Sequence, residues 1–198
     1  MSDIAALYVQ EGGCYFGLEG VDPWDEARDA RRYAGPHPVV AHPPCGRWCQ
    51  MASVVEARYG YAIGDDGGTF AAALDSVRTW GGVLEHPAYT IAWERYGLPE
   101  PIRNGWSRSL FDPGWVTEVS QSAYGHRARK RTWLYYVGPE PPPLDWRDVP
   151  GKAYIGWGDY SKYRNIPRIG KAESSATPPA FRALLLELAR LSLGGSQA

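Results

Sequence analysis

Several features that assign a chain to a broad class are missing from this sequence of 198 residues. Its three cysteines are odd in number and dispersed, so they provide no disulfide framework and suit a reducing compartment. No apolar run approaches the roughly 18 residues of a membrane-spanning helix, and the N-terminus lacks the basic and apolar regions of a signal peptide. We therefore expect a cytoplasmic protein that makes no membrane contact.

A strong charge of either sign is also missing, because the formal net charge is −1 at pH 7. This excludes a generally basic protein that coats nucleic acid, so any nucleic-acid contact must come from a local patch. Aromatic residues, in contrast, are abundant, with nine tryptophans and thirteen tyrosines. Such rings stack on flat ligands, although a large core uses the same residues.

The chain alternates short apolar runs with stretches of helical periodicity, which is typical of an α/β fold. The expected strands lie at residues 4–9, 39–41, 83–87, 115–121 and 131–137. A helix is expected over residues 69–79, begun by Asp65 or Asp66 as a capping residue. At this length we expect a single domain with a Rossmann-like three-layer architecture over residues 1–193, and a disordered tail over 194–198.

The predicted fold is organised around an apolar strand that ends in His42-Pro-Pro-Cys45. Proline cannot donate to a sheet ladder, so the two prolines end the strand there. In an open α/β sheet the ligand crevice lies beyond the carboxyl ends of the strands, which makes Cys45 a candidate nucleophile. The alternative is a buried cysteine that packs as a small hydrophobic residue.

The same construction recurs at Val83-Leu-Glu-His-Pro87, where a short apolar strand is followed by a polar residue and a proline. The helix between the two strands is long enough for a right-handed crossover, so Glu85 and Cys45 are expected at two strand ends of one sheet. The alternative is a carboxylate that only bonds a neighbouring loop. A zinc site at His42, Cys45 and Cys49 is set aside, because structural zinc sites have four ligands and only three are local. No metal is expected.

A concentrated basic segment, Arg127-Ala-Arg-Lys-Arg131, connects the last two predicted strands. Such clusters neutralise a nucleic-acid backbone, and arginine forks bind phosphates and planar groups. The candidate nucleic-acid contacts are therefore Arg127, Arg129, Lys130 and Arg131, with Arg47 beside Cys45. The alternative is a solvated hairpin tip.

Both ends of the predicted domain carry turn signals. After the first strand, Gly12 and Gly13 fit a nucleotide-binding turn, although a hairpin is an alternative because Val21-Asp-Pro-Trp24 interrupts any following helix. Residues 25–33 predict a short surface helix. Near the C-terminus, Thr177 is expected to cap a helix that starts at Pro178. Its predicted core stripe consists of Phe181, Leu184, Leu185, Leu188 and Leu191.

Four short blocks of the sequence occur in a suggestive order: Pro44-Cys45, Glu85, Arg129-Lys-Arg131 and Ser174-Ser-Ala-Thr-Pro-Pro179. This set resembles a pared-down DNA (cytosine-5) methyltransferase, in which a Pro-Cys at a strand end carries the nucleophile. In that family a strand-end Glu and an Arg-x-Arg pair follow at similar separations. The blocks are scattered over most of the chain. The catalytic region also resembles that of small phage-encoded proteins with a His-Pro-Pro-Cys centre.

The resemblance implies a methyltransferase-like fold that modifies a pyrimidine base in DNA, most simply by methylation of cytosine at C5. Cys45 would add to C6 as a thiolate, and Glu85 would face N3 of the ring. Arg129 and Arg131 would hold O2 and the phosphates, while the base leaves the duplex stack.

The resemblance also implies S-adenosylmethionine as the cofactor, held by Gly12, Gly13, Asp22 and Thr177. The family's acidic-aromatic turn with Gly-x-Gly-Gly corresponds here to residues 6–13, which lack the acid and the first glycine. About thirty-five residues separate Val137 from Ser174, too few for a separate target-recognition domain. We therefore expect specificity for a DNA sequence to be slight, or to come from a protein partner.

Two other functions are compatible with the same residues. An enzyme of this kind could use another electrophile, or act on a free pyrimidine nucleotide. A methyltransferase-like module without activity could instead bind nucleic acid through residues 127–131. Cys45→Ala separates these functions, because it abolishes an enzyme and leaves the affinity of a binding module within about tenfold.

Overall fold

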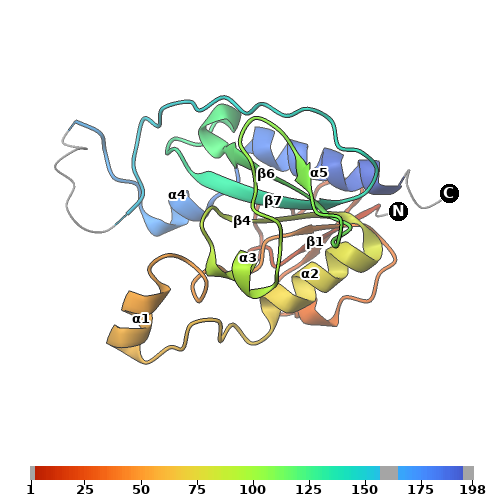
Figure 1. The fold of residues 1–198 in the computed structure, drawn as a ribbon, viewed down its shortest axis with the longest axis horizontal. Coiled ribbons are helices and arrows are strands. Elements are labelled where there is room, and N and C mark those ends of the chain that lie inside the picture. The colour runs from red at the N-terminus through yellow and green to blue at the C-terminus, as the bar shows by residue number, and fades with distance from the viewer. Residues whose placement is uncertain (1–2, 157–164, 194–198) are drawn as a thin grey trace.

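A mixed sheet of seven strands forms the centre of the computed structural model, which describes residues 3–156 and 165–193 (Figure 1). The strands are β1 (Ile4–Leu7), β2 (Val21–Trp24), β3 (Val39–Ala41), β4 (Gly82–Pro87), β5 (Ser107–Arg108), β6 (Trp115–Ser120) and β7 (Arg131–Val137). Their order across the sheet is β2-β1-β3-β4-β7-β6-β5. The first four strands in this order are parallel, whereas β7, β6 and β5 each pair antiparallel with their neighbours. The expected tail at 194–198 lies outside the described residues.

The described residues form the helices α1 (Ala52–Tyr59), α2 (Thr69–Trp80), α3 (Ile91–Arg95), α4 (Lys171–Ser175) and α5 (Pro179–Ser192), with 3₁₀ turns at Ala30–Arg32 and Gln121–Tyr124. The two longest, α2 and α5, flank the sheet on opposite sides. The long helix α2 packs on β3 and β4, and α5 packs on β1, β3 and β4 from the opposite face. The expected α/β fold is thereby confirmed. Within the described residues, no helix is long and apolar enough to cross a membrane.

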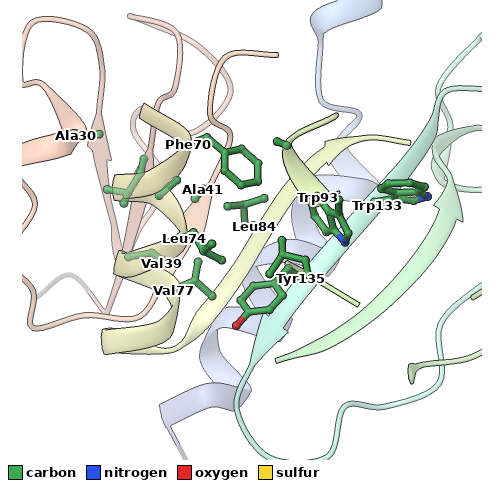
Figure 2. Close-up of a cluster of buried hydrophobic side chains, with 14 of the residues drawn as sticks. Ala30, Val39, Ala41, Phe70, Leu74, Val77, Leu84, Trp93, Trp133 and Tyr135 are labelled. Atoms are coloured by element: carbon green, nitrogen blue, oxygen red, sulfur yellow. The ribbon is translucent and has the colours of Figure 1, made fainter. Parts of the chain in front are cut away.

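Alternation along the strands divides the core into two halves. The half on the α2 side contains Val39, Ala41, Leu84, Tyr135, Phe70, Leu74 and Val77 (Figure 2). The intervening strand residues pack toward α5, in a cluster that contains Val40, Val83, Leu134, Phe181, Leu185 and Leu188. Because both faces are covered, β1 and β3 are buried along their whole length, as parallel strands usually are.

The start of α2 is fixed by Asp66, one of the two predicted capping residues. Its carboxylate accepts hydrogen bonds from the backbone N–H groups of Gly68 and Phe70 and from the Thr69 hydroxyl. The same carboxylate accepts the indole N–H of Trp48, at 2.8 Å. Asp66 therefore ties the loop after Cys45 to the helix that leads into β4.

The connection between β1 and β2 differs from both sequence interpretations. The two strands pair in parallel, so the hairpin is wrong, and no helix follows Gly12 and Gly13 within residues 8–20. Tyr8 and Gly12, with φ of 59° and 62°, turn the chain instead. The proline that interrupts a helix, Pro23, lies in β2, where it is tolerated because β2 is an edge strand.

Two predicted helices have different bounds in the structure. Residues 25–33 contain only the 3₁₀ turn at Ala30–Arg32, because Asp29 is left-handed with φ of 52° and its carboxylate bonds the N–H of Arg31. The last helix starts at Pro179, so Thr177 is not its capping residue. A residue that precedes a proline disfavours helical geometry, which moves the start past Thr177 and Pro178. Leu191, expected in the core stripe, is 42% exposed in the final turn.

Candidate active site

Cys45 follows β3, whereas Glu85 lies within the neighbouring parallel strand β4, one residue past its last pair with β3. The expected position of Glu85 at a strand end is therefore wrong, because β4 continues to Pro87 by pairing with β7. Ala41 of β3 pairs with Leu84 of β4, so His42 lies next to Glu85 in register. The two prolines carry the chain beyond β3 to Cys45, whose side chain is half-buried. Burial, and after it the negative charge of Glu85, raise the pKa of the Cys45 thiol.

A chain of three hydrogen-bonded side chains includes Glu85. The His42 Nδ1 atom lies 2.9 Å from Glu85 Oε1, and the Tyr15 hydroxyl lies 2.8 Å from His42 Nε2. Burial raises the pKa of Tyr15 well above its usual value, so the hydroxyl keeps its proton. In the neutral tautomer of His42 whose Nδ1–H donates to Glu85, the Nε2 atom accepts this O–H. The sequence suggested His42 only as a metal ligand and gave no signal for Tyr15.

Glu85 stays ionised despite its burial. Burial alone raises its pKa, but the hydrogen bond from His42 and the positive charge of Lys130 outweigh that effect and lower the pKa to about 2. Its second oxygen, Oε2, is buried without a hydrogen-bond partner in the described part of the chain. Since a buried, unpaired carboxylate oxygen is costly, this atom suits a hydrogen-bond donor that a ligand supplies.

The thiol of Cys45 is protonated in the free protein. Burial is the largest cause of its raised pKa, followed by the charge of Glu85, whereas Lys130 lowers it. A ligand that neutralises Glu85 removes part of this repulsion and favours the reactive thiolate. Of the predicted basic segment, Lys130 is thus the residue whose charge acts on both Cys45 and Glu85.

The three arginines of the basic segment lie in ion pairs. The pairs join Arg127 to Glu173, Arg129 to Asp148, and Arg131 to Glu118. The guanidinium of Arg131 also lies 4.5 Å from the ring centre of Tyr89. The sequence showed the positive charges but not their partners, which come from distant segments. The predicted patch is therefore largely neutralised by the chain itself.

A cavity of about 450 Å³ lies beside these ion pairs. Its lining includes Arg103, Arg129, Arg131, Arg147, Glu118 and Trp146. The cavity opens near the same edge of the sheet as Cys45, because Thr132 at the start of β7 pairs with Pro87 at the end of β4. Asp145 and Asp148 also line the cavity. Its four guanidinium groups are paired with three carboxylates: Arg103 and Arg131 with Glu118, Arg129 with Asp148, and Arg147 with Asp145.

The residues expected to hold S-adenosylmethionine do not fit that cofactor. Asp22 pairs with Ala5 near the start of β1, whereas Gly12 and Gly13 lie beyond the other end of that strand. The Asp22 carboxylate is occupied by Arg28 and by the indole of Trp24. Thr177 precedes α5 and makes no capping hydrogen bond. No step of the reaction below is therefore assigned to this cofactor.

His42, Cys45 and Cys49, which the sequence analysis set aside as a zinc site, form no metal-binding group in the described part of the chain. Across residues 3–156 and 165–193, no group of three or more His, Cys, Asp or Glu side chains has a metal-binding arrangement. His42 is engaged by Tyr15 and Glu85, and the Cys49 sulfur lies 4.0 Å from the carbonyl of Gly46.

Comparison with known proteins gave no match from which a function could be inferred. No family model, no curated protein and no solved structure matches the chain. The function proposed below therefore rests on the chemistry of five side chains: Tyr15, His42, Cys45, Glu85 and Lys130.

The low pKa of Glu85 predicts how acid affects the fold. An unfolded glutamate titrates at its ordinary pKa of 4.5, and the folded one titrates at about 2. Between these values the unfolded chain binds more protons, so stability falls as the pH falls. From roughly pH 5 to pH 2.5, the free energy of unfolding of the unchanged protein should therefore decrease more steeply than that of Glu85→Gln.

Urea denaturation at stepwise pH measures both slopes. Glu140→Gln, which removes an exposed carboxylate, is the matched control and should keep the slope of the unchanged protein. Equal slopes for Glu85→Gln and the unchanged protein would contradict an ionised, His42-bonded Glu85.

Proposed function

We propose that this protein modifies pyrimidine bases through covalent addition of Cys45 to ring atom C6, which activates C5. The observation that carries this proposal is the half-paired carboxylate of Glu85, whose charge acts on the half-buried thiol at the adjacent strand end. A methyltransferase-like, Rossmann-like domain is the architecture we assign to it. The parallel set β2-β1-β3-β4 with an adjoining antiparallel β7 supports that assignment.

In the proposed reaction the 4-amino group of cytosine donates to Glu85 Oε2, and the acceptor atom N3 lies beside the same carboxylate. The Cys45 thiol gives its proton to Glu85, which passes a proton to N3 as the sulfur–C6 bond forms. The electrons of the 5,6 double bond move toward C4, so the adduct is an enamine whose C5 is nucleophilic. Lys130 stabilises the negative charge on sulfur as it forms, since its charge reaches Cys45.

The second half of the reaction restores the ring. C5 forms a bond to an electrophile and then releases its own hydrogen as a proton to solvent. The sulfur leaves C6, the 5,6 double bond re-forms and N3 returns its proton, which regenerates Cys45 and Glu85. With a methyl donor the product of cytosine is 5-methylcytosine. Throughout, His42 and Tyr15 hold the Glu85 carboxylate in one orientation.

DNA is the leading substrate, because the order of the Pro-Cys, Glu and Arg-x-Arg blocks favours it. Since the described fold has no separate recognition module, a protein partner would supply specificity for sequence. A free pyrimidine nucleotide is the second candidate. It is favoured by the ion pairs of Arg127, Arg129 and Arg131, which leave less positive charge for a polyanion. DNA affinity that falls steeply with salt would support the first substrate.

The addition step is testable without knowing the electrophile. In D₂O, reversible addition lets a deuteron act as the electrophile, so C5 exchanges its hydrogen for deuterium. We expect mass spectrometry to detect deuterated deoxycytidine after incubation with single-stranded DNA, duplex DNA or deoxycytidine monophosphate. The substrate that exchanges identifies the preferred class, and no deuterium in any of the three would refute the proposal.

The transferred group is then identified in cells. DNA from cells that express the protein is digested to nucleosides, beside DNA from cells that express Cys45→Ala. An added methyl group that depends on Cys45 supports methylation. A different mass that also depends on Cys45 keeps the covalent mechanism and replaces the donor.

A further inference from the structure

An open groove lies next to the candidate active site, on the segment that follows Cys45. This segment carries α1 away from the sheet, and α1 itself buries only Ala52 (Figure 1). The groove has a volume of about 710 Å³ and is lined in part by Pro44 and Gly46. Because these residues flank Cys45 in the chain, the groove begins beside the proposed nucleophile.

Aromatic rings form the far part of this groove. Tyr59 and Tyr61 are stacked, with ring centres 6.3 Å apart and an angle of 29° between the planes. The guanidinium of Arg47 lies 3.9 Å from the ring centre of Tyr61. Both tyrosines are more than half exposed, at 60% and 53%, although large aromatic side chains usually bury most of their area. They contribute little to the core, and the part of the pair that Arg47 does not cover is open to another ring.

The charged residues of the groove indicate which kind of aromatic ligand it would bind. The Asp65 carboxylate lies in the lining, whereas the neighbouring Asp66 is already bonded to Trp48 and to the start of α2. A carboxylate repels a phosphate but accepts hydrogen bonds from the N–H groups of a nucleobase. Purines offer such donors together with the larger stacking face.

From these contacts we infer that the groove binds a purine base adjacent to the target pyrimidine in single-stranded nucleic acid. The purine stacks on Tyr59 and Tyr61 and donates an N–H to Asp65. This inference rests on the proposed function, because Cys45 fixes the position of the pyrimidine from which the neighbouring base extends. A single strand is required, since stacking on tyrosine replaces stacking on the neighbouring bases of a duplex.

The test measures binding, with chemistry kept separate. The probe is a fluorescent single-stranded oligonucleotide with one deoxycytidine flanked by purines, and its partner probe has abasic sites at the flanking positions. Tyr59→Leu/Tyr61→Leu should bind the purine-flanked probe about tenfold more weakly than the unchanged protein does. Its affinity for the abasic probe should equal that of the unchanged protein. Phe111→Leu removes another exposed ring, from outside the groove, and should change neither affinity.

A second variant distinguishes loss of the stacking contact from misfolding of the protein. Asp65→Asn keeps the shape of the groove, and it should also weaken binding of the purine-flanked probe more than binding of the abasic probe. Equal losses for both probes, or no loss for either, would overturn the inference. Weakened binding of S-adenosylmethionine with unchanged oligonucleotide binding would also overturn it, because the ring would then belong to a donor molecule.

The outcomes separate this inference from the proposed reaction. Binding that depends on the purine, without deuterium exchange on any substrate, would refute the reaction and leave the stacking site. Deuterium exchange with binding that ignores the neighbouring base would refute the stacking site and leave the reaction.

Discussion

Cys45→Ser is expected to lower the rate of C5 deuterium exchange by at least about a thousandfold. A serine hydroxyl is far less acidic than a thiol, and the charge of Glu85 opposes a second negative charge at this position. Loss of the sulfur therefore removes the adduct itself and not only its orientation. Binding of the oligonucleotide should remain within about threefold, because the side chains are nearly equal in size.

The other two cysteines provide matched controls. Cys14→Ser changes an exposed cysteine and should leave the exchange rate unchanged. Cys49→Ser changes a half-buried cysteine in the same segment as Cys45. It should lower the rate of C5 deuterium exchange by less than about tenfold. A large loss of exchange rate in Cys49→Ser, together with a small loss in Cys45→Ser, would identify Cys49 as the nucleophile and contradict the proposed site.

Gly82→Ala is expected to destabilise the fold by at least about 4 kcal/mol, or to prevent folding altogether. Gly82 begins β4 with a φ of +109°, a conformation that other residues rarely adopt. A Cβ at this position would lie 2.0 Å from the carbonyl oxygen of Val39, in the middle of the sheet. Neither strand can move aside without breaking the β3–β4 pairing that sets His42 beside Glu85.

Urea denaturation followed by circular dichroism measures this effect. Gly170→Ala is the control, since a Cβ there meets no atom within 4 Å, and its cost should stay below about 1 kcal/mol. A Gly82→Ala protein as stable as this control would mean that β3 and β4 pair in another register. The contact between His42 and Glu85 would then be wrong as well.

The sequence predicted the parts of the site that depend on local patterns. Apolar runs ended by prolines located β3, which precedes Cys45, and β4, which contains Glu85, and an Asp before a helical stretch located the capping carboxylate of Asp66. Both signals work because a proline or a capping carboxylate acts on the few residues around it. The mixed order of the sheet was not predictable in the same way, since strand pairing depends on contacts far apart in sequence.

Long-range partners account for what the sequence missed. Tyr15 and His42 are 27 positions apart, and His42 and Glu85 are 43 apart, so no local pattern marks their hydrogen bonds. The ion pairs of the basic segment were not predictable from the sequence for the same reason. Its positive charge was visible in the sequence, whereas Glu118, Asp148 and Glu173, which pair with it, lie on three other segments. A cluster of like charges therefore predicts a surface patch only when its counter-charges are known.

Asp66 has a consequence for how such a protein changes over evolutionary time. By bonding both Trp48 and the start of α2, it closes a unit that runs from β3 to β4 and includes Cys45 and Glu85. The residues from Cys45 to Glu85 thus form one contiguous block of sequence, and insertions after β4 or β7 would fall outside it.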